Sequence, residues 1–210
     1  YHGDIFRKDN SLGTNSKTDF FLTNAYSYLS FDNLDDFYFP TKGTNLYTEF
    51  SLMADLKKTN EVSPVALLKM KNVIPLDKNA SLLFDLYGRA LFNSDFPVIR
   101  NTLVGGESYS QYFNYHLPFV GLPAVSIAER YTYISLIGLR MKIAKSQYVS
   151  LLFNGMWQDT DMIFREKVEA IYGGGIRYSL KTMLGPLDVT MGYSGSTDKP
   201  TFSANFGMYF

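Results

Sequence analysis

The sequence predicts an all-β protein, an antiparallel transmembrane β-barrel, and three observations predict it. Runs of about nine to twelve residues alternate apolar and polar side chains, the length that a tilted strand needs to cross a bilayer. Tyr and Phe are abundant, with 16 and 17 residues, as expected for a lipid face with aromatic girdles. The chain also ends on an amphipathic segment, Thr201 to Phe210, whose last residue is aromatic.

The alternation assigns side chains to two faces, because neighbouring residues of a strand point in opposite directions. Between 187 and 194, for example, Leu187, Val189, Met191 and Tyr193 oppose Asp188, Thr190, Gly192 and Ser194. Charged residues occur on the polar face in the middle of several runs: Glu49, Asp55, Asp85, Arg89, Arg140, Lys142 and Arg177. In a membrane barrel the apolar face meets lipid and the polar face lines the lumen. Periodicity alone leaves a soluble β protein open as the alternative, whereas strand length and aromatic content favour the membrane.

About ten strands are predicted, near 18–32, 45–57, 64–75, 81–93, 109–119, 130–144, 147–158, 168–182, 186–195 and 201–210. Short turns are expected at 77–79, 145–146 and 184–186, and longer links at 32–44, 93–108 and 159–167. Short turns at one rim and long loops at the other are typical of outer-membrane barrels, whose short turns face the periplasm. We therefore expect one barrel domain over 18–210, with 1–17 poorly ordered or a remnant of an upstream strand or loop.

The search for chemistry is mostly negative. A formal net charge of zero gives no support to charge-driven nucleic-acid binding, and the absence of cysteine excludes disulfides and thiol catalysis. The sequence has no phosphate-binding loop, no dinucleotide fingerprint and no histidine–carboxylate spacing for a metal. A hydrolase embedded in the barrel would have to use one of two histidines, His2 in the N-terminal end or His116 among aromatic residues, and His116 is more simply a histidine of a loop or strand end. Gly173, Gly174 and Gly175 lie within a strand pattern and indicate close packing or barrel curvature.

Four segments together carry a resemblance to a known family. They are the turn FPTKG at 39–43, the Gly-Gly loop RNTLVGGESYSQYFNYHLPFVGL at 100–122, the series GIRY…GPL…GY, and the terminal FGMYF. From about residue 20 to 210 the chain resembles the barrel of the outer-membrane assembly and translocation superfamily (bacterial surface antigens). That superfamily includes BamA-like and TamA-like proteins, two-partner secretion transporters and patatin-like autotransporters. The resemblance implies a sixteen-strand barrel, of which the last ten strands would be present here, with earlier strands and any periplasmic modules before Tyr1.

The resemblance also assigns roles to particular residues. It implies barrel turn and loop motifs at Phe39, Pro40, Thr41, Lys42, Gly43, Gly105 and Gly106. It further implies an assembly signal, recognised by the barrel-assembly machinery, at Phe206, Gly207, Tyr209 and Phe210. No catalytic, cofactor-binding or metal-binding residue is implied for this segment.

One departure decides between members of the family. In BamA-like members an arginine follows the Gly-Gly of the long loop, whereas here Gly105-Gly106 is followed by a stretch without arginine. The sequence Leu117-Pro118-Phe119 resembles barrels fused to patatin-like phospholipases of Bacteroidetes-type bacteria. The expected function is therefore to anchor, and to translocate, an N-terminal patatin-like hydrolase, whose catalytic dyad would lie upstream. The alternative is a BamA/TamA-like insertion and assembly factor.

The same resemblance sets the expected surroundings of the protein. The location is the bacterial outer membrane of a Gram-negative cell. The expected partners are outer-membrane lipids, the barrel-assembly machinery, and the protein's own N-terminal domain or periplasmic modules, without nucleic acid and without a cofactor. This segment is expected not to be an enzyme, and the full-length protein would be one only through an upstream domain.

Overall fold

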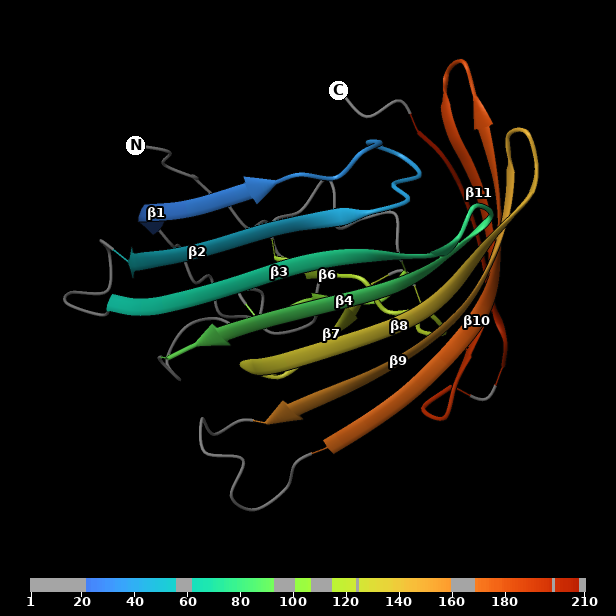
Figure 1. Cartoon of the computed structure of the whole chain (residues 1–210). Coiled ribbons are helices and arrows are strands. Elements are labelled where there is room, and N and C mark those ends of the chain that lie inside the picture. The colour runs from blue at the N-terminus through green and yellow to red at the C-terminus, as the bar shows by residue number, and fades with distance from the viewer. Residues whose placement is uncertain are drawn as a thin grey trace.

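A curved antiparallel sheet of nine strands makes up most of the computed structural model (Figure 1). The structure describes residues 22–55, 62–92, 101–106, 115–123, 125–159, 169–197 and 199–207. The nine strands are β1 (Leu22–Asp32), β2 (Gly43–Asp55), β3 (Val62–Asp77), β4 (Ala80–Leu91), β8 (Tyr131–Ala144), β9 (Gln147–Asp159), β10 (Glu169–Thr182), β11 (Gly185–Ser194) and β12 (Thr201–Phe206). Strands adjacent in this list are hydrogen-bonded neighbours in the sheet. Within the described residues no helix has the length and apolar character needed to cross a membrane.

Nine of the ten predicted strands are confirmed to within a few residues, since local alternation determines them. The tenth, predicted over 109–119, is wrong as a strand of the barrel wall. Among its described residues only β6 (His116–Leu117) is a strand, and it pairs with β5 (Leu103–Val104) in a separate sheet. The physical reason is burial on all sides: every residue from His116 to Leu122 is buried, so no face of this stretch is available to lipid.

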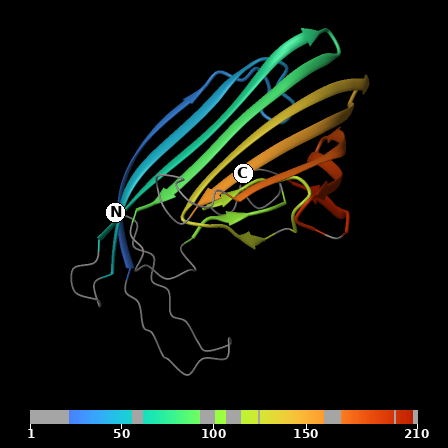
Figure 2. The ribbon, with the colours of Figure 1, turned by 90° about the horizontal axis from the view of Figure 1, so that it is seen from below.

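The separate sheet lies inside the curve of the large one. It has the order β6-β5-β7, where β7 is Ser126–Ile127. Figure 1 shows these three short strands on the concave side of the wall, and the view from below in Figure 2 places them between the two ends of the curved sheet. The polypeptide between β4 and β8 therefore folds back into the concave space instead of adding a strand to the wall.

The two faces of the wall differ as the alternation predicted. The convex face presents exposed apolar side chains along eight of the nine strands, all but β4: Leu29, Phe31, Phe50, Leu52, Leu68, Ile74, Tyr133, Ile137, Met141, Leu151, Phe153, Tyr172, Ile176, Tyr178, Val189, Met191, Tyr193, Phe202 and Phe206. The concave face carries the charged residues of the same strands, among them Glu49, Asp85, Arg89, Arg140 and Arg177. An exposed apolar belt around a polar interior is the pattern of a barrel surrounded by lipid.

The connections between strands confirm only part of the predicted rim arrangement. Two-residue turns join β3 to β4 at 78–79, β8 to β9 at 145–146 and β10 to β11 at 183–184, all at one rim, hereafter the short-turn rim. The link at 32–44, expected among the long loops, is at this same rim, because β1 and β2 are antiparallel and meet there through Asp32 and Asn45. The described ends of β2, β4 and β9, from which the longer links depart, lie at the opposite rim.

Candidate functional site

The concave space next to the long links is filled by the chain itself. We call residues 101–106, 115–123 and 125–130, which carry β5, β6 and β7, the inner segment. Its side chains Val104, Leu117 and Phe119 have no solvent exposure. They form one apolar cluster with Tyr87 and Ile134 of the wall. Close packing of this kind excludes water, so this half of the interior is a protein core.

A side-chain amide fixes the inner segment to the wall. Asn154, on the concave face of β9, accepts a hydrogen bond from the backbone N–H of Val120 through Oδ1 at 3.0 Å. Its Nδ2 donates to the carbonyl oxygen of the same residue at 3.3 Å. Both Asn154 and Val120 are buried, with 5% and 3% exposure, so water does not compete for these groups. The amide thus satisfies two backbone groups that would otherwise be buried without partners.

Glycines of the wall make room for this contact. A Cβ added at Gly173 would lie 2.5 Å from the carbonyl oxygen of Val120, and one at Gly192 would lie 2.7 Å from the nitrogen of Gly121. Gly121 itself has φ +99° and approaches the carbonyl of Tyr193, so the segment also needs glycine on its own side. The predicted close packing of the 173–175 triplet is confirmed, and the inner segment is one of the neighbours that requires it.

An arginine on the concave face of the wall contacts the inner segment. Arg89 of β4 is 1% exposed, and its Nη1 lies 3.4 Å from the hydroxyl of Thr102, to which it donates. Its guanidinium also stacks over the ring of Tyr115 at 4.7 Å from the centroid, a cation–π geometry. His116, the candidate for a barrel-embedded hydrolase, is fully buried beside this contact in β6.

The short-turn rim has its own inward-folded piece, residues 33–42, which we call the turn segment. Phe39 is 5% exposed and stacks on Tyr148 of β9, with ring centroids 4.5 Å apart and planes 7° from parallel. Arg140 of β8 donates a hydrogen bond to the carbonyl oxygen of Pro40. Asp36 forms an ion pair with Lys181 of β10. The segment between the first two strands therefore contacts strands from the middle and far side of the wall.

Hydrogen bonds within the turn segment hold its shape. The Asp35 carboxylate accepts from the backbone nitrogens of Thr41 and Lys42 at 2.7 and 3.1 Å and from the Thr41 hydroxyl. Partial burial works to raise the pKa of Asp35, but these hydrogen bonds together lower it below its ordinary value. At the base, Gly43 has φ +110°, and a Cβ there would lie 2.5 Å from the carbonyl oxygen of Asn33. Glycine at 43 is thus required by the reversal itself.

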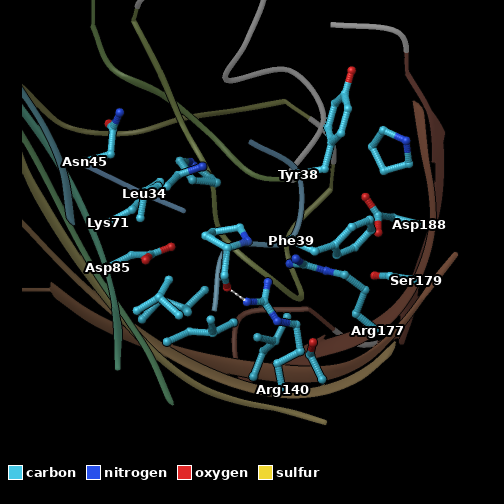
Figure 3. Close-up of a pocket in the computed structure, with 18 of the residues that line it drawn as sticks. Leu34, Tyr38, Phe39, Asn45, Lys71, Asp85, Arg140, Arg177, Ser179 and Asp188 are labelled. Atoms are coloured by element: carbon cyan, nitrogen blue, oxygen red, sulfur yellow. Dashed lines mark hydrogen bonds between the residues drawn. The ribbon is translucent and has the colours of Figure 1, made fainter. Parts of the chain in front are cut away.

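Between the turn segment and the inner segment lies a polar cavity of about 790 Å³. Figure 3 shows its lining, with Arg140 and Arg177 of the wall next to Phe39 of the turn segment, whereas the Tyr38 side chain points away from both arginines. Charged side chains of the wall line it: Lys71, Asp85, Arg140, Arg177 and Asp188. Pro118 of the inner segment also lines it. The described residues contain no group of three or more His, Asp or Glu that could hold a metal ion.

The structure places the residues that the sequence singled out at three separate locations. Phe39, Pro40, Thr41 and Lys42 lie in the turn segment, with Gly43 as the first residue of β2. Gly105 and Gly106 have φ +119° and +42° and follow β5, where Gly106 bridges to Phe119. Phe206 ends β12 on the convex face, and Gly207 donates its N–H to the carbonyl of Pro186 at 3.2 Å. Tyr209 and Phe210 lie outside the described residues.

Sequence reasoning missed Asn154, Arg89 and Tyr148 as residues that receive the two inward-folded segments. Each lies on the polar or mixed face of a predicted strand, where a lumen-lining residue and a docking residue look the same. A weak signal existed for Arg89, because a charge in mid-strand in a lumen needs a polar partner or an aromatic face.

These features define the class of the protein. A meandering antiparallel wall with a lipid-type convex face and an internally packed segment is typical of part of a β-barrel of the bacterial outer membrane. A sequence model described as the OMP85 superfamily matches residues 6–210, and the chain belongs to this superfamily. Its location is accordingly the bacterial outer membrane. No individual curated protein matches the sequence.

Proposed function

We propose that this barrel is the membrane anchor of a larger protein that carries a patatin-like hydrolase domain upstream. The observation that supports an anchor is the packed core between the inner segment and the wall. Phe119 and Leu117 are fully buried there, and Asn154 holds the backbone of Val120. A lumen filled in this way resists the passage of water and ions, which suits anchoring better than conduction. The hydrolase itself is supported by the resemblance of Leu117-Pro118-Phe119 to barrels of that kind.

The test uses the full-length protein, extracted from outer membranes with detergent and reconstituted into phospholipid vesicles. The anchor proposal expects release of fatty acid from the vesicle lipids and a conductance close to that of empty bilayers. An inactive variant of the upstream nucleophile should abolish fatty-acid release and leave the heat-modifiable migration of the barrel unchanged. Absence of any hydrolytic activity in the full-length protein would contradict the proposal.

A second candidate, a factor that inserts other barrels into the membrane, is favoured by one specific observation. β12 pairs with β11 and lies at one end of the nine-stranded sheet, with no second neighbouring strand among the described residues. An edge strand presents backbone groups that can pair with a strand of an incoming chain. Vesicles containing the protein would then accelerate the folding of an unfolded outer-membrane barrel added from outside. Acceleration together with absent lipid hydrolysis would favour this candidate over the anchor.

A further inference from the structure

We propose that the turn segment, residues 33–42, is a releasable latch that closes the polar cavity at the short-turn rim. The cavity of about 790 Å³ is lined by Pro118 of the inner segment and by seven consecutive residues of the turn segment, 34–40. Removal of this segment would open the cavity toward the rim without disturbing a ladder of the wall, because none of its residues belongs to a strand.

The turn segment is built to keep its own shape when it leaves the wall. The Asp35 carboxylate is hydrogen-bonded to Thr41 and Lys42 across the loop. At the base, the Asn33 N–H donates to the Thr44 carbonyl at 3.0 Å, and the Thr44 N–H donates to the Asn33 side chain at 2.6 Å. These bonds are all local, so they are retained in an open position. Gly43, with φ +110°, ends the loop as the first residue of β2 and stays in the ladder with Val73 of β3.

The contacts that hold the latch to the wall come from side chains and not from a strand ladder. They include the stacking of Phe39 on Tyr148, the hydrogen bond from Arg140 to the Pro40 carbonyl, the ion pair of Asp36 with Lys181, and the hydrogen bond from the Ser81 hydroxyl to the Thr41 carbonyl at 3.4 Å. The ion-pair side chains are partly exposed, with 42% for Lys181 and 32% for Asp36, so water can replace this contact at small cost. A loop outside the strand ladders can open locally before the protein unfolds globally.

The closed latch also binds two cationic groups of the wall. Arg140 and Lys181 are bound to acceptors of the turn segment, namely a carbonyl and a carboxylate. Opening releases both cations from these acceptors next to the cavity. The proposal concerns access to this cavity, and it holds whether the whole protein is an anchor or an insertion factor.

The experiment measures access to the cavity with a single cysteine, since residues 1–210 contain none. Ser150 of β9 is the reporter position, because it is 1% exposed, lines the cavity and is paired with Arg140 of β8. The full-length protein carries Ser150→Cys, with any cysteine outside these residues replaced, and is reconstituted in vesicles. A membrane-impermeant methanethiosulfonate reagent labels it, and Lys145→Cys at the exposed rim gives the rate for a fully accessible thiol.

The proposal expects slow labelling at 150 with the latch intact. Phe39→Ala should raise the rate by about tenfold or more, because a buried aromatic anchor is lost. Lys181→Met should raise it by about two- to fivefold, since only an exposed ion pair is removed. Lys145→Met, a matched loss of a rim lysine without this ion pair, should leave the rate unchanged. All variants should keep the heat-modifiable migration of a folded barrel, which separates opening from unfolding.

Two results would overturn the latch. One is a labelling rate at 150 in the otherwise unaltered protein that equals the rate at 145. The other is an unchanged slow rate in both Phe39→Ala and Lys181→Met while each remains folded.

Discussion

The side chain of Asn154 binds both backbone groups of a single residue, Val120, in the interior of the barrel. Its oxygen accepts from the Val120 N–H at 3.0 Å, and its nitrogen donates to the Val120 carbonyl at 3.3 Å. The two residues belong to different layers, since Asn154 is part of the wall and Val120 is part of the inner segment. The Asn154 side chain therefore replaces the two backbone hydrogen bonds that a neighbouring strand would form with Val120.

Replacement of Asn154 by Leu should loosen the inner segment. The change has a similar volume but leaves the N–H and carbonyl of Val120 buried without partners, at about 1–3 kcal/mol for each unsatisfied group. We expect a lower temperature for the loss of heat-modifiable migration and faster proteolysis within the inner segment. Ser203→Ala, on the concave face of β12 and exposed, is the control and should change neither measurement.

Replacement of Gly173 by Ala should disturb the same contact from the wall side. The new methyl group would lie 2.5 Å from the Val120 carbonyl oxygen and 2.8 Å from the ring of Phe119. Such overpacking costs about 1–3 kcal/mol, since neither the wall nor the packed segment can move freely. Gly195→Ala is the matched control, because a Cβ there meets nothing within 4 Å. Equal thermal stability of the two variants would show that the inner segment is not in close contact with the wall.

Arg89 is expected to position the inner segment through the planar shape of its side chain. It donates to Thr102 and stacks over Tyr115, and a lysine keeps the charge but cannot stack in the same way. Arg89→Lys should therefore increase proteolysis at the inner segment, and Arg89→Met should do so more strongly, with a loss of about 2–3 kcal/mol for a charged hydrogen bond. Lys142→Met, which removes an exposed cation of β8 outside the inner segment, provides the comparison and should leave the protection of the inner segment unchanged. Identical protection of the inner segment in Arg89→Met and the unaltered protein would contradict this role.

The convex face should not tolerate charge in the middle of a strand. Ile176 lies on the convex face near the middle of β10 and is 57% exposed, as expected for a side chain in contact with lipid. Ile176→Arg should cost about 2–4 kcal/mol near the bilayer centre and should reduce the amount of folded protein in outer membranes. Ser203→Arg, on the concave face at the cavity, is the control and should assemble normally. Normal assembly of Ile176→Arg would mean that this face does not meet lipid.

The wall was predictable from the sequence because strand periodicity is local information. Leu187 to Ser194 alternate on two faces in the structure as they do in the sequence, and the same is true around Ile176. The sequence also predicts that Phe206 lies on the apolar face, which the structure confirms. The period of two says nothing about what covers the polar face, so the packing of that face against the inner segment could not be deduced.

The incorrect strand over 109–119 and the undetected contacts of the FPTKG turn also result from the use of local sequence alone. The stretch 109–119 contains apolar residues that could belong to a strand facing lipid, but Leu117 and Phe119 pack into the interior against Tyr87 and Ile134. Local sequence shows that a side chain is hydrophobic, but it does not show whether that side chain contacts lipid or protein. For FPTKG, glycine and proline indicate a reversal, but the stacking of Phe39 on Tyr148 joins residues far apart in the chain. Contacts of this kind depend on the curvature of the whole sheet.

The ion pair between Asp36 and Lys181 should make the stability of the turn segment depend on acidity. Partial burial works to raise the pKa of Asp36, but hydrogen bonds from Lys181 and from the backbone of Phe39 and Tyr38 together lower it below the ordinary 3.8. A carboxyl whose pKa is lower in the folded state stabilises that state when ionised. Its contribution is therefore fully present above the ordinary pKa and is lost as the pH falls through the folded-state pKa.

The thermal stability of the unaltered protein should exceed that of Asp36→Asn at pH 7, and the difference should disappear only below pH 3.8. A difference between the two proteins that stays constant to the lowest pH measured would show that the ionised Asp36 carboxylate does not hold the turn segment in place.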